Sequence, residues 1–329
     1  MAFSGGLDST VLLQLLADLA RREALPPLRA IHVHHGLQSA ADAWPEHCRR
    51  VCTALGVPLE VVRVQVEAGS SLEQAARQAR YAAIELRLED GEVLLTAQHR
   101  DDQAETLLFR LLRGAGVRGL AAMPARRRLG RGWLVRPLLD VSRGELEAHA
   151  RRLGLTWVED PSNDSLEFSR NYLRHQVMPV LAQRWPQTAT TLARTAAHMA
   201  EAQALLDELA EMDLAMMASP GAYAWLPVPS LALAPMLSLS PARQRNALRH
   251  WLAPFTALPD SEHWQGWESL CAAAADATPV WRLAAGELHR CGDRLWWLSG
   301  RWLRPVVGPV AWNDPNQALQ LPDNGSVQI

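Results

Sequence analysis

The chain has 329 residues, of which 48% are hydrophobic and 21% charged, an ordinary globular composition that is long enough for two domains. No apolar run approaches the roughly 20 residues of a membrane-spanning helix, and the first residues lack the layout of a secretory signal. The net charge of −2 neither favours nor excludes a nucleic-acid partner.

The first motif is the turn Ser4-Gly5-Gly6, which directly precedes a helical pattern. Leucines recur at helical spacing over residues 12–19, so we predict that a helix begins at Leu7 or Asp8. Unpaired N–H groups at a helix start favour an anion, and glycines let the backbone approach a phosphate closely. The turn lacks the Lys of a Walker A loop. We interpret it as a different nucleotide phosphate loop, with an ordinary strand–turn–helix junction as the alternative.

Strand and helix patterns alternate through the first half of the chain. The expected strands span residues 28–36, 59–66, 92–99 and 133–139, and the expected helices span 71–89, 101–113 and 142–153, with another ending at Leu55. Ser71 is the expected N-cap of the helix at 71–89, and an Arg-rich loop precedes the strand expected at 133–139. This alternation predicts an α/β fold with a doubly wound parallel sheet, whose ligands bind at the carboxyl ends of the strands.

Histidines end the strand expected at 28–36. Strand alternation places His32 and His34 on one face, which is compatible with a metal site. No acidic or Cys partner stands at ligand spacing nearby, so we favour His34 and His35 as polar groups that line the crevice.

Acidic residues open the helix expected after the strand at 92–99. Asp102 and Glu105 share one helical face, and Asp101 precedes them. Acids at this position complement the helix dipole. They also lie at a strand's carboxyl end, where carboxylates can hold Mg²⁺ or a cationic amine. Both interpretations stay open, and the nearby phosphate loop favours the second.

Arginines mark two further regions. Residues 106–139 contain eight arginines and no acid, which indicates either a surface for nucleic-acid phosphates or a solvated basic face. Farther along, Arg170 and Arg174 lie one helical turn apart and flank Asn171. That spacing fits a phosphate grip or an exposed helix with salt bridges.

The composition changes beyond residue 185. We predict helices over 188–217 and 241–252, the second capped by Ser240, and short antiparallel strands within 280–298. The tryptophans of this half are expected in a core. The expected domains are 1–185, a smaller and mainly helical domain at 186–300, and a linker with the start of another domain at 301–329. Three residues precede Ser4 where a strand of about five is expected, so we expect a sequence truncated at both ends.

Four motifs together resemble those of the bacterial tRNA(Ile)-lysidine synthetase family, within the PP-loop ATP pyrophosphatase superfamily. SGGLDST matches the family's SGGxDS loop, HVHHGL its second-strand motif, HRDDQAET its H-x-x-D-D-Q-x-E-T motif, and SRNYLR its R-N-x-x-R element. Their order and spacing agree with the family over residues 1 to about 185. The resemblance implies an adenine-nucleotide alpha-hydrolase-like fold.

The resemblance also implies a cytoplasmic ligase that modifies the wobble cytidine of a CAU-anticodon isoleucine tRNA. ATP would adenylate the C2 oxygen of cytosine, and the ε-amine of free lysine would then attack C2 and expel AMP. ATP, Mg²⁺, tRNA and lysine are the implied ligands, the domain after residue 186 would bind tRNA, no membrane is implied, and a homodimer is left open.

The family's functional residues carry over onto the matching positions. Contacts with ATP are implied for Ser4, Gly5, Gly6, Leu7, Asp8, Ser9, Thr10 and His34. Catalytic roles are implied for Asp8, Asp102 and Glu105, with the last two receiving the lysine ammonium or Mg²⁺; Asp8, Asp101 and Asp102 are the implied metal ligands. Contacts with tRNA or phosphates are implied for Arg113, Arg126, Arg127, Arg128, Arg170, Asn171 and Arg174.

Two other functions were weighed against this one. A tRNA thiolase of the same superfamily commonly needs a C-x-x-C or a catalytic Cys pair, whereas Cys48 and Cys52 lie one helical turn apart, where buried thiols are expected. A non-catalytic RNA-binding module would need no acids beside its phosphates.

Overall fold

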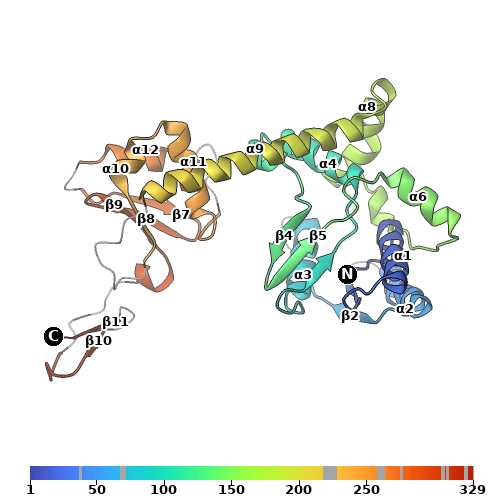
Figure 1. The fold of residues 1–329 in the computed structure, drawn as a ribbon, viewed down its shortest axis with the longest axis horizontal. Helices are drawn as coiled ribbons and strands as arrows, with labels where there is room; N and C mark the ends of the chain where they lie inside the picture. Colours follow the sequence, from blue (N-terminus) through green and yellow to red (C-terminus); the bar gives the residue numbers. More distant parts are fainter. Residues whose placement is uncertain are drawn as a thin grey trace. The chain divides into compact units, whose positions relative to one another are not determined.

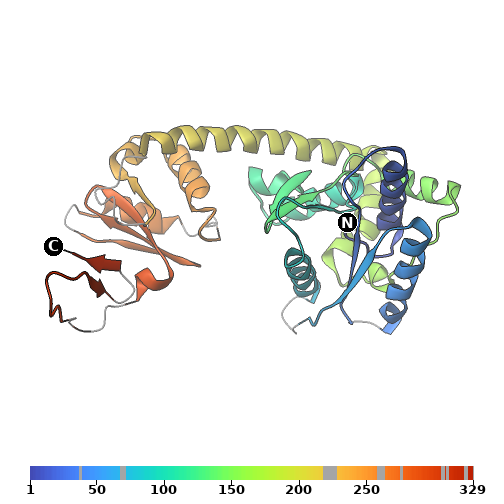
Figure 2. The same ribbon diagram turned by 60° about the horizontal axis from the view of Figure 1, so that its bottom comes forward.

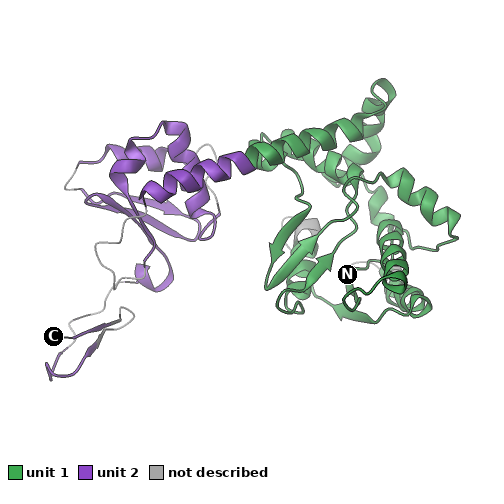
Figure 3. Cartoon of the chain, viewed as in Figure 1, with its two compact units in different colours: residues 1–203 green, residues 204–329 purple. Residues whose placement is uncertain are grey.

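The computed structural model describes residues 1–36, 39–66, 72–217, 228–257, 264–274, 277–304, 308, 311–321 and 325–328. The chain divides into two compact units, residues 1–203 and 204–329, with the boundary inside one long helix (Figure 3). Within the described residues, no helix combines the length and apolar character needed to cross a bilayer.

The first unit contains a mainly parallel sheet. Strand β1 (Ala30–His34) pairs in parallel with β2 (Leu59–Arg63), and β3 (Val93–Leu95) pairs in parallel with β5 (Gly132–Val135). Residues 1–3 join the two pairs: Phe3 N–H donates to Ile31 O at 2.8 Å, and Ala2 N–H donates to Leu95 O at 2.9 Å. Strand β4 (Arg126–Leu129) adds an antiparallel edge beside β5.

Helices pack on both faces of this sheet, as the sequence predicts (Figure 1, Figure 2). One hydrophobic core combines Phe3 with residues of α1 (Leu7–Arg22), α2 (Trp44–Leu55) and α6 (Arg143–Arg152). A second core packs α3 (Leu72–Glu85) against β1, β3 and β5. The remaining helical segments are η1 (Ser39–Ala43), α4 (Arg100–Leu111), α5 (Val117–Leu120), η2 (Pro161–Asp164), α7 (Ser169–Tyr172), η3 (Leu173–Val177) and α8 (Met178–Arg184).

The element boundaries confirm several expectations and correct others. Helix α1 begins at Leu7, as predicted. The strands expected at 59–66, 92–99 and 133–139 are shorter, and the N-cap expected at Ser71 lies outside the described residues. The helix expected at 101–113 is α4, which begins and ends slightly earlier.

The segment expected as an Arg-rich loop is in part the hairpin β4–β5. Arg126 and Arg128 lie over the ring of Trp133, with guanidinium carbons 3.7 and 4.3 Å from its centroid. On the opposite face of the hairpin, Leu129 and Leu134 are buried in the second core. Cross-strand stacking and this burial stabilise a strand that the run of charges conceals in the sequence.

The second unit has its own core and sheet. Helix α9 (Thr188–Met217) leads into this unit and, like α11 (Pro241–Leu252), has the predicted bounds. The antiparallel sheet has the strand order β6-β9-β8-β7. The other elements are β6 (Ser230–Ala232), α10 (Leu233–Leu237), α12 (Gln265–Ala272), β7 (Val280–Leu283), β8 (Gly286–Cys291), β9 (Arg294–Leu298), η4 (Gly300–Leu303), β10 (Leu319–Leu321) and β11 (Gly325–Val327).

Tryptophans fill the core of the second unit, as the sequence predicts. Trp264, Trp267, Trp281 and Trp297 are buried there. The fully buried carboxylate of Asp213 is paired with the guanidinium of Arg243, which leaves no isolated charge at that position.

Leu134→Ala tests the second core of the first unit. Leu134 is 0% exposed, so we expect the substitution to lower the free energy of unfolding of this unit by about 2–5 kcal/mol through lost burial and a residual cavity. Equilibrium urea unfolding measures the change. The matched control is Leu86→Ala, because Leu86 is 81% exposed and its truncation is expected to change stability by at most about 0.5 kcal/mol. Equal effects of the two substitutions would contradict the packing described here.

Candidate active site

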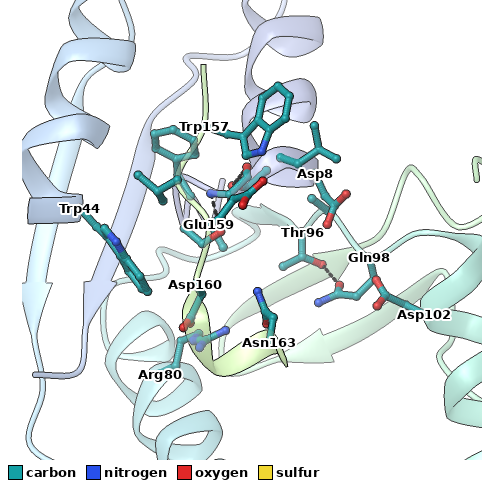
Figure 4. Close-up of a pocket in the computed structure, with 18 of the residues that line it drawn as sticks. Asp8, Trp44, Arg80, Thr96, Gln98, Asp102, Trp157, Glu159, Asp160 and Asn163 are labelled. Atoms are coloured by element: carbon teal, nitrogen blue, oxygen red, sulfur yellow. Dashed lines mark hydrogen bonds between the residues drawn. The ribbon is translucent and has the colours of Figure 1, made fainter. Parts of the chain in front are cut away.

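A cavity of about 750 Å³ lies in the first unit, at the carboxyl ends of the parallel strands. Its walls come from the turn after residues 1–3, the residues that follow β1 and β3, the start of α4, and the segment 157–164. Figure 4 shows Asp8 and Asp102 on one side of the cavity and Trp44 and Arg80 on the other. The cavity lies at the edge where a parallel sheet of this kind is expected to bind its ligands.

The turn at the start of α1 is held open by its own hydrogen bonds. Gly5 has φ +86°, a conformation that favours glycine, and a Cβ there would lie in tight contact, 3.0 Å from Cys48 Sγ. Ser9 Oγ donates to Gly6 O at 3.0 Å, and Thr10 Oγ1 donates to Gly5 O at 3.4 Å. The hydroxyl of buried Thr10 therefore holds the backbone of the loop from the protein interior. The residues of the motif that line the cavity are Ser4, Gly6, Leu7, Asp8 and Ser9.

Asp8 has one carboxylate oxygen without a partner. Its Oδ2 lies 3.5 Å from Arg143 Nη1 and 3.7 Å from His99 Nε2. Its Oδ1 is buried and has no hydrogen-bond partner among the described residues. Burial raises the pKa of Asp8, although the nearby His99 and Arg143 oppose that shift. The free oxygen lies beside the helix start that the sequence assigned to phosphates.

His99 connects three carboxylates, and the sequence had not singled it out as a site residue. It is 1% exposed and forms the N-cap of α4. Asp102 N–H donates to its Nδ1, while its own backbone N–H donates to Asp102 Oδ2 at 3.1 Å. An acceptor at Nδ1 leaves the proton on Nε2, which faces Asp8 and Asp102 at 3.7 and 3.5 Å. In the sequence, its position just before the first helical residue of HRDDQAET could have indicated that it caps this helix beside the acids.

Asp102 and Glu105 are each bound by Arg170 and Arg174. Arg170 Nη2 donates to Asp102 Oδ1 at 3.0 Å, and Arg170 Nε donates to Glu105 Oε2 at 3.0 Å. Arg174 Nη2 donates to Asp102 Oδ1 at 3.1 Å, and Arg174 Nε donates to Glu105 Oε1 at 2.7 Å. Burial raises the pKa of Asp102, but His99 and the two guanidiniums outweigh burial and hold it below its ordinary value. The negative charges of the two carboxylates in this cluster are therefore matched by the positive charges of two guanidiniums.

The three carboxylates expected to bind Mg²⁺ do not converge on one point. These carboxylates, of Asp8, Asp101 and Asp102, surround His99. Two of them already accept hydrogen bonds: Asp101 Oδ2 accepts the backbone N–H of Arg143 at 2.9 Å, and Asp102 accepts the bonds described above. Over the described parts of the chain, no group of three or more His, Cys, Asp or Glu side chains is arranged to hold a metal. A three-carboxylate site does not fit, whereas the unpartnered Asp8 Oδ1 fits an ion held by one carboxylate and substrate phosphates.

Of the two histidines expected to line the cavity, His35 does so, whereas His34, the last residue of β1, does not. His34 is buried, with Nε2 3.3 Å from Asp42 Oδ1. His32 and His35 line the cavity, and His35 Nε2 lies 3.1 Å from Arg80 Nη2. Burial and the charge of Arg80 lower the pKa of His35 to about 4, so this imidazole is neutral at physiological pH.

The other predicted contact residues lie away from the cavity. The side-chain amide of Asn171 donates to the backbone oxygens of Ser162 and Ser165 and holds the turn at 161–164. Arg113 lies over the ring of Phe109 at 4.5 Å. Arg126, Arg127 and Arg128 belong to β4, where Arg127 lies 5.3 Å from the ring centroid of Tyr81.

The segment 157–164 contributes wall residues that the sequence had not assigned. Val158 N–H donates to Gly5 O at 2.9 Å, which attaches this segment to the phosphate loop. Its cavity residues are Trp157, Val158, Glu159, Asp160, Asn163 and Asp164. In the sequence, the acids and Asn beside a Pro could have indicated that this segment belongs to the site. The segment lies far from the other motifs along the chain, so its contact with the phosphate loop was not visible there.

Comparisons with known proteins agree with this geometry. Residues 1–181 match the family model described as PP-loop domain, and residues 231–296 match the TilS substrate binding domain. The chain is 64% identical over 329 residues to the tRNA(Ile)-lysidine synthase of Pseudomonas fluorescens, an alignment that covers 100% of the chain and 74% of the relative. The chain belongs to the tRNA(Ile)-lysidine synthase family. The Pseudomonas aeruginosa member is 61% identical over 332 residues, covering 100% of the chain and 75% of that protein.

A solved structure supports the fold of this lysidine synthase family member. The U34-tRNA thiolase NcsA from Methanococcus maripaludis superposes with a TM-score of 0.50 at 19% identity, covering 61% of the chain and 71% of the thiolase. At this identity the likeness concerns the α/β fold alone.

The cysteines do not favour sulfur transfer. Cys48 and Cys52 are buried in α2, where burial raises the pKa of Cys48 to about 12 and that of Cys52 to about 11. A thiol with such a pKa is protonated at neutral pH and is a weak nucleophile.

Alkylation tests this assignment. In the native protein we expect iodoacetamide to label exposed Cys291 and to leave Cys48 and Cys52 unlabelled, because both are buried and protonated. Peptide mass spectrometry after a timed reaction measures the labelling, and unfolding in urea should expose all four cysteines. Rapid labelling of Cys48 in the folded protein would contradict the prediction and reopen the thiolase alternative.

Proposed function

We propose that this protein ligates lysine to C2 of the wobble cytidine of a CAU-anticodon isoleucine tRNA and thereby forms lysidine. The C2 oxygen attacks the α-phosphorus of ATP, and the bond to the leaving pyrophosphate breaks. The ε-amine of lysine then forms a bond to C2, loses a proton, and the C2–O bond breaks to release AMP. The observation that carries the proposal is one cavity that joins the phosphate loop to the acids of α4 in a member of this enzyme family.

The phosphate loop binds the triphosphate in this proposal. Ser4, Gly6, Leu7 and Ser9 line the cavity at the start of α1, where the helix N-terminus suits an anion. Asp8 Oδ1 is the protein ligand proposed for Mg²⁺, which supplies positive charge to the phosphates when it is bound.

The Asp102–Glu105 pair is the proposed site for the lysine ammonium. Because Arg170 and Arg174 already bind both carboxylates, an ammonium enters by replacing guanidinium contacts. Arg174 lines the cavity and is the guanidinium proposed to yield, after which it can approach the phosphates. This exchange accounts for the two roles implied by the motifs, acids for lysine and arginines for phosphates.

The hairpin β4–β5 is the proposed contact surface for tRNA in this unit. Arg126 and Arg128 are exposed, and the ring of Trp133 holds their guanidiniums in place. Arginine binds phosphate oxygens in a two-point geometry, so such a surface suits the tRNA backbone.

Mass spectrometry of isoleucine tRNA tests the function directly. After incubation with the protein, ATP and lysine, we expect lysidine at the wobble position, accompanied by pyrophosphate release. Asp8→Asn removes the charge that faces the phosphates and should abolish tRNA-dependent ATP–pyrophosphate exchange, with an unchanged circular dichroism spectrum. Normal exchange by this variant would exclude Asp8 from the reaction, and incorporation of sulfur in place of lysine would overturn the proposed function.

Glu105→Gln tests the lysine site. The free ε-ammonium has an unperturbed pKa of about 10.4, so it arrives charged and needs carboxylates close by. We expect the variant still to form adenylated tRNA, but its KM for lysine should rise about ten- to hundredfold with the loss of a charged hydrogen bond. The matched control is Glu147→Gln on the exposed side of α6. Equal lysine dependence in the wild type and the Glu105 variant would contradict the assignment.

A further inference from the structure

We propose that Arg143 is a nucleotide-binding residue that pairs with Asp8 in this structure and would move its guanidinium to the triphosphate of ATP when Mg²⁺ binds at Asp8. The inference rests on the proposed function, because it concerns the ATP used for adenylation. Neither the motifs nor the family resemblance had pointed to this residue.

The backbone of Arg143 is fixed at the cavity wall. Arg143 is the first residue of α6, and its backbone N–H donates to Asp101 Oδ2 at 2.9 Å. The preceding residue, Ser142, forms a reciprocal capping box with Glu145. The start of α6 is thereby attached to the start of α4, which places the Arg143 side chain over the cavity.

The side chain of Arg143 is held much less firmly than its backbone. Its Nη1 lies 3.5 Å from Asp8 Oδ2, which exceeds the 2.7–3.2 Å of a normal N–H···O hydrogen bond. The side chain is 47% exposed. A guanidinium has five N–H donors, and the contact with Asp8 involves only Nη1, so other donors of Arg143 can bind an incoming anion.

The two other arginines that line the cavity are engaged differently. Arg174 donates to both Asp102 and Glu105, and Arg80 contacts His35. Arg143 differs from them because its cavity partner is Asp8, whose second oxygen is free for a cation. A cation on Asp8 neutralises the charge that holds Arg143, and phosphates at the start of α1 then offer the guanidinium a stronger partner.

This exchange places a positive charge where adenylation needs one. When the C2 oxygen forms its bond to the α-phosphorus, the bond to the bridging oxygen breaks and its electron pair leaves with pyrophosphate. A guanidinium on the triphosphate stabilises that growing negative charge. Arg143 is therefore expected to affect ATP binding and adenylation, and to leave the later attack by lysine unchanged.

Three variants test the inference. Arg143→Ala removes the guanidinium but keeps the backbone N–H that binds Asp101, so α6 should remain in place. Arg143→Lys keeps a charge without the forked donors. Arg151→Ala is the matched control, because Arg151 lies on the same helix and pairs with Glu147 at the surface.

The measurements are direct binding of ATP by calorimetry, with and without Mg²⁺, and tRNA-dependent ATP–pyrophosphate exchange. We expect Arg143→Ala to weaken Mg²⁺-dependent ATP binding about ten- to hundredfold and to slow exchange, with the KM for lysine and the affinity for tRNA unchanged. Arg143→Lys should recover part of the loss, and Arg151→Ala should match the wild type.

The inference is overturned if Arg143→Ala binds Mg²⁺-ATP as the wild type does, or if its defect appears in tRNA affinity instead. A wild-type protein that binds ATP but does not modify tRNA would contradict the proposed function alone. In that case the binding comparison between wild type and Arg143→Ala still decides the role of Arg143.

Discussion

Asp102 Oδ2 accepts the backbone N–H of His99, and His99 Nδ1 accepts the N–H of Asp102, so one reciprocal pair fixes the first turn of α4. Three other charged parts of the cavity wall contact this turn. Asp101 binds the start of α6, Asp102 binds Arg170 of α7 and Arg174 of η3, and His99 faces Asp8 at the start of α1. A disturbance of this turn would therefore move the proposed phosphate and lysine sites together.

Charge balance limits what substrates can do in this cavity. Asp102 and Glu105 are neutralised by two guanidiniums, and Asp8 lies beside the guanidinium of Arg143 and the imidazole of His99. Burying new unpaired charge is costly, so the proposed substrates bind by exchanging partners within existing ion pairs. In this proposal, ATP with Mg²⁺ would bind Asp8 and Arg143 in place of their present contact, and the lysine ammonium would replace a guanidinium on the α4 carboxylates. The two substrates thereby act on different ion pairs that share the start of α4.

Short-range patterns in the sequence predicted much of the fold. Helical spacing of apolar residues gave the start of α1 and the bounds of α9 and α11, because each of these depends on contacts within one helix and its amphipathic face. The Arg-rich segment was predicted less well. Strand β4 depends on Trp133 across the hairpin and on a hydrophobic core from other elements, and neither is visible in a run of arginines.

The sequence by itself determined the parallel α/β architecture, the phosphate loop at Ser4–Gly6, and the acids at the start of α4. These features follow from local residue types and spacing. Glycine allows the conformation of the turn, a helix N-terminus favours negative charge, and residues three apart share one face of a helix. Only the tertiary structure decided which charges pair. Arg170 lies 65 residues from Glu105 in the chain, and Arg143 lies 42 residues from Asp101, so the folded positions of α4, α6 and α7 bring them together. Such pairing depends on distances in space, which local sequence patterns do not encode.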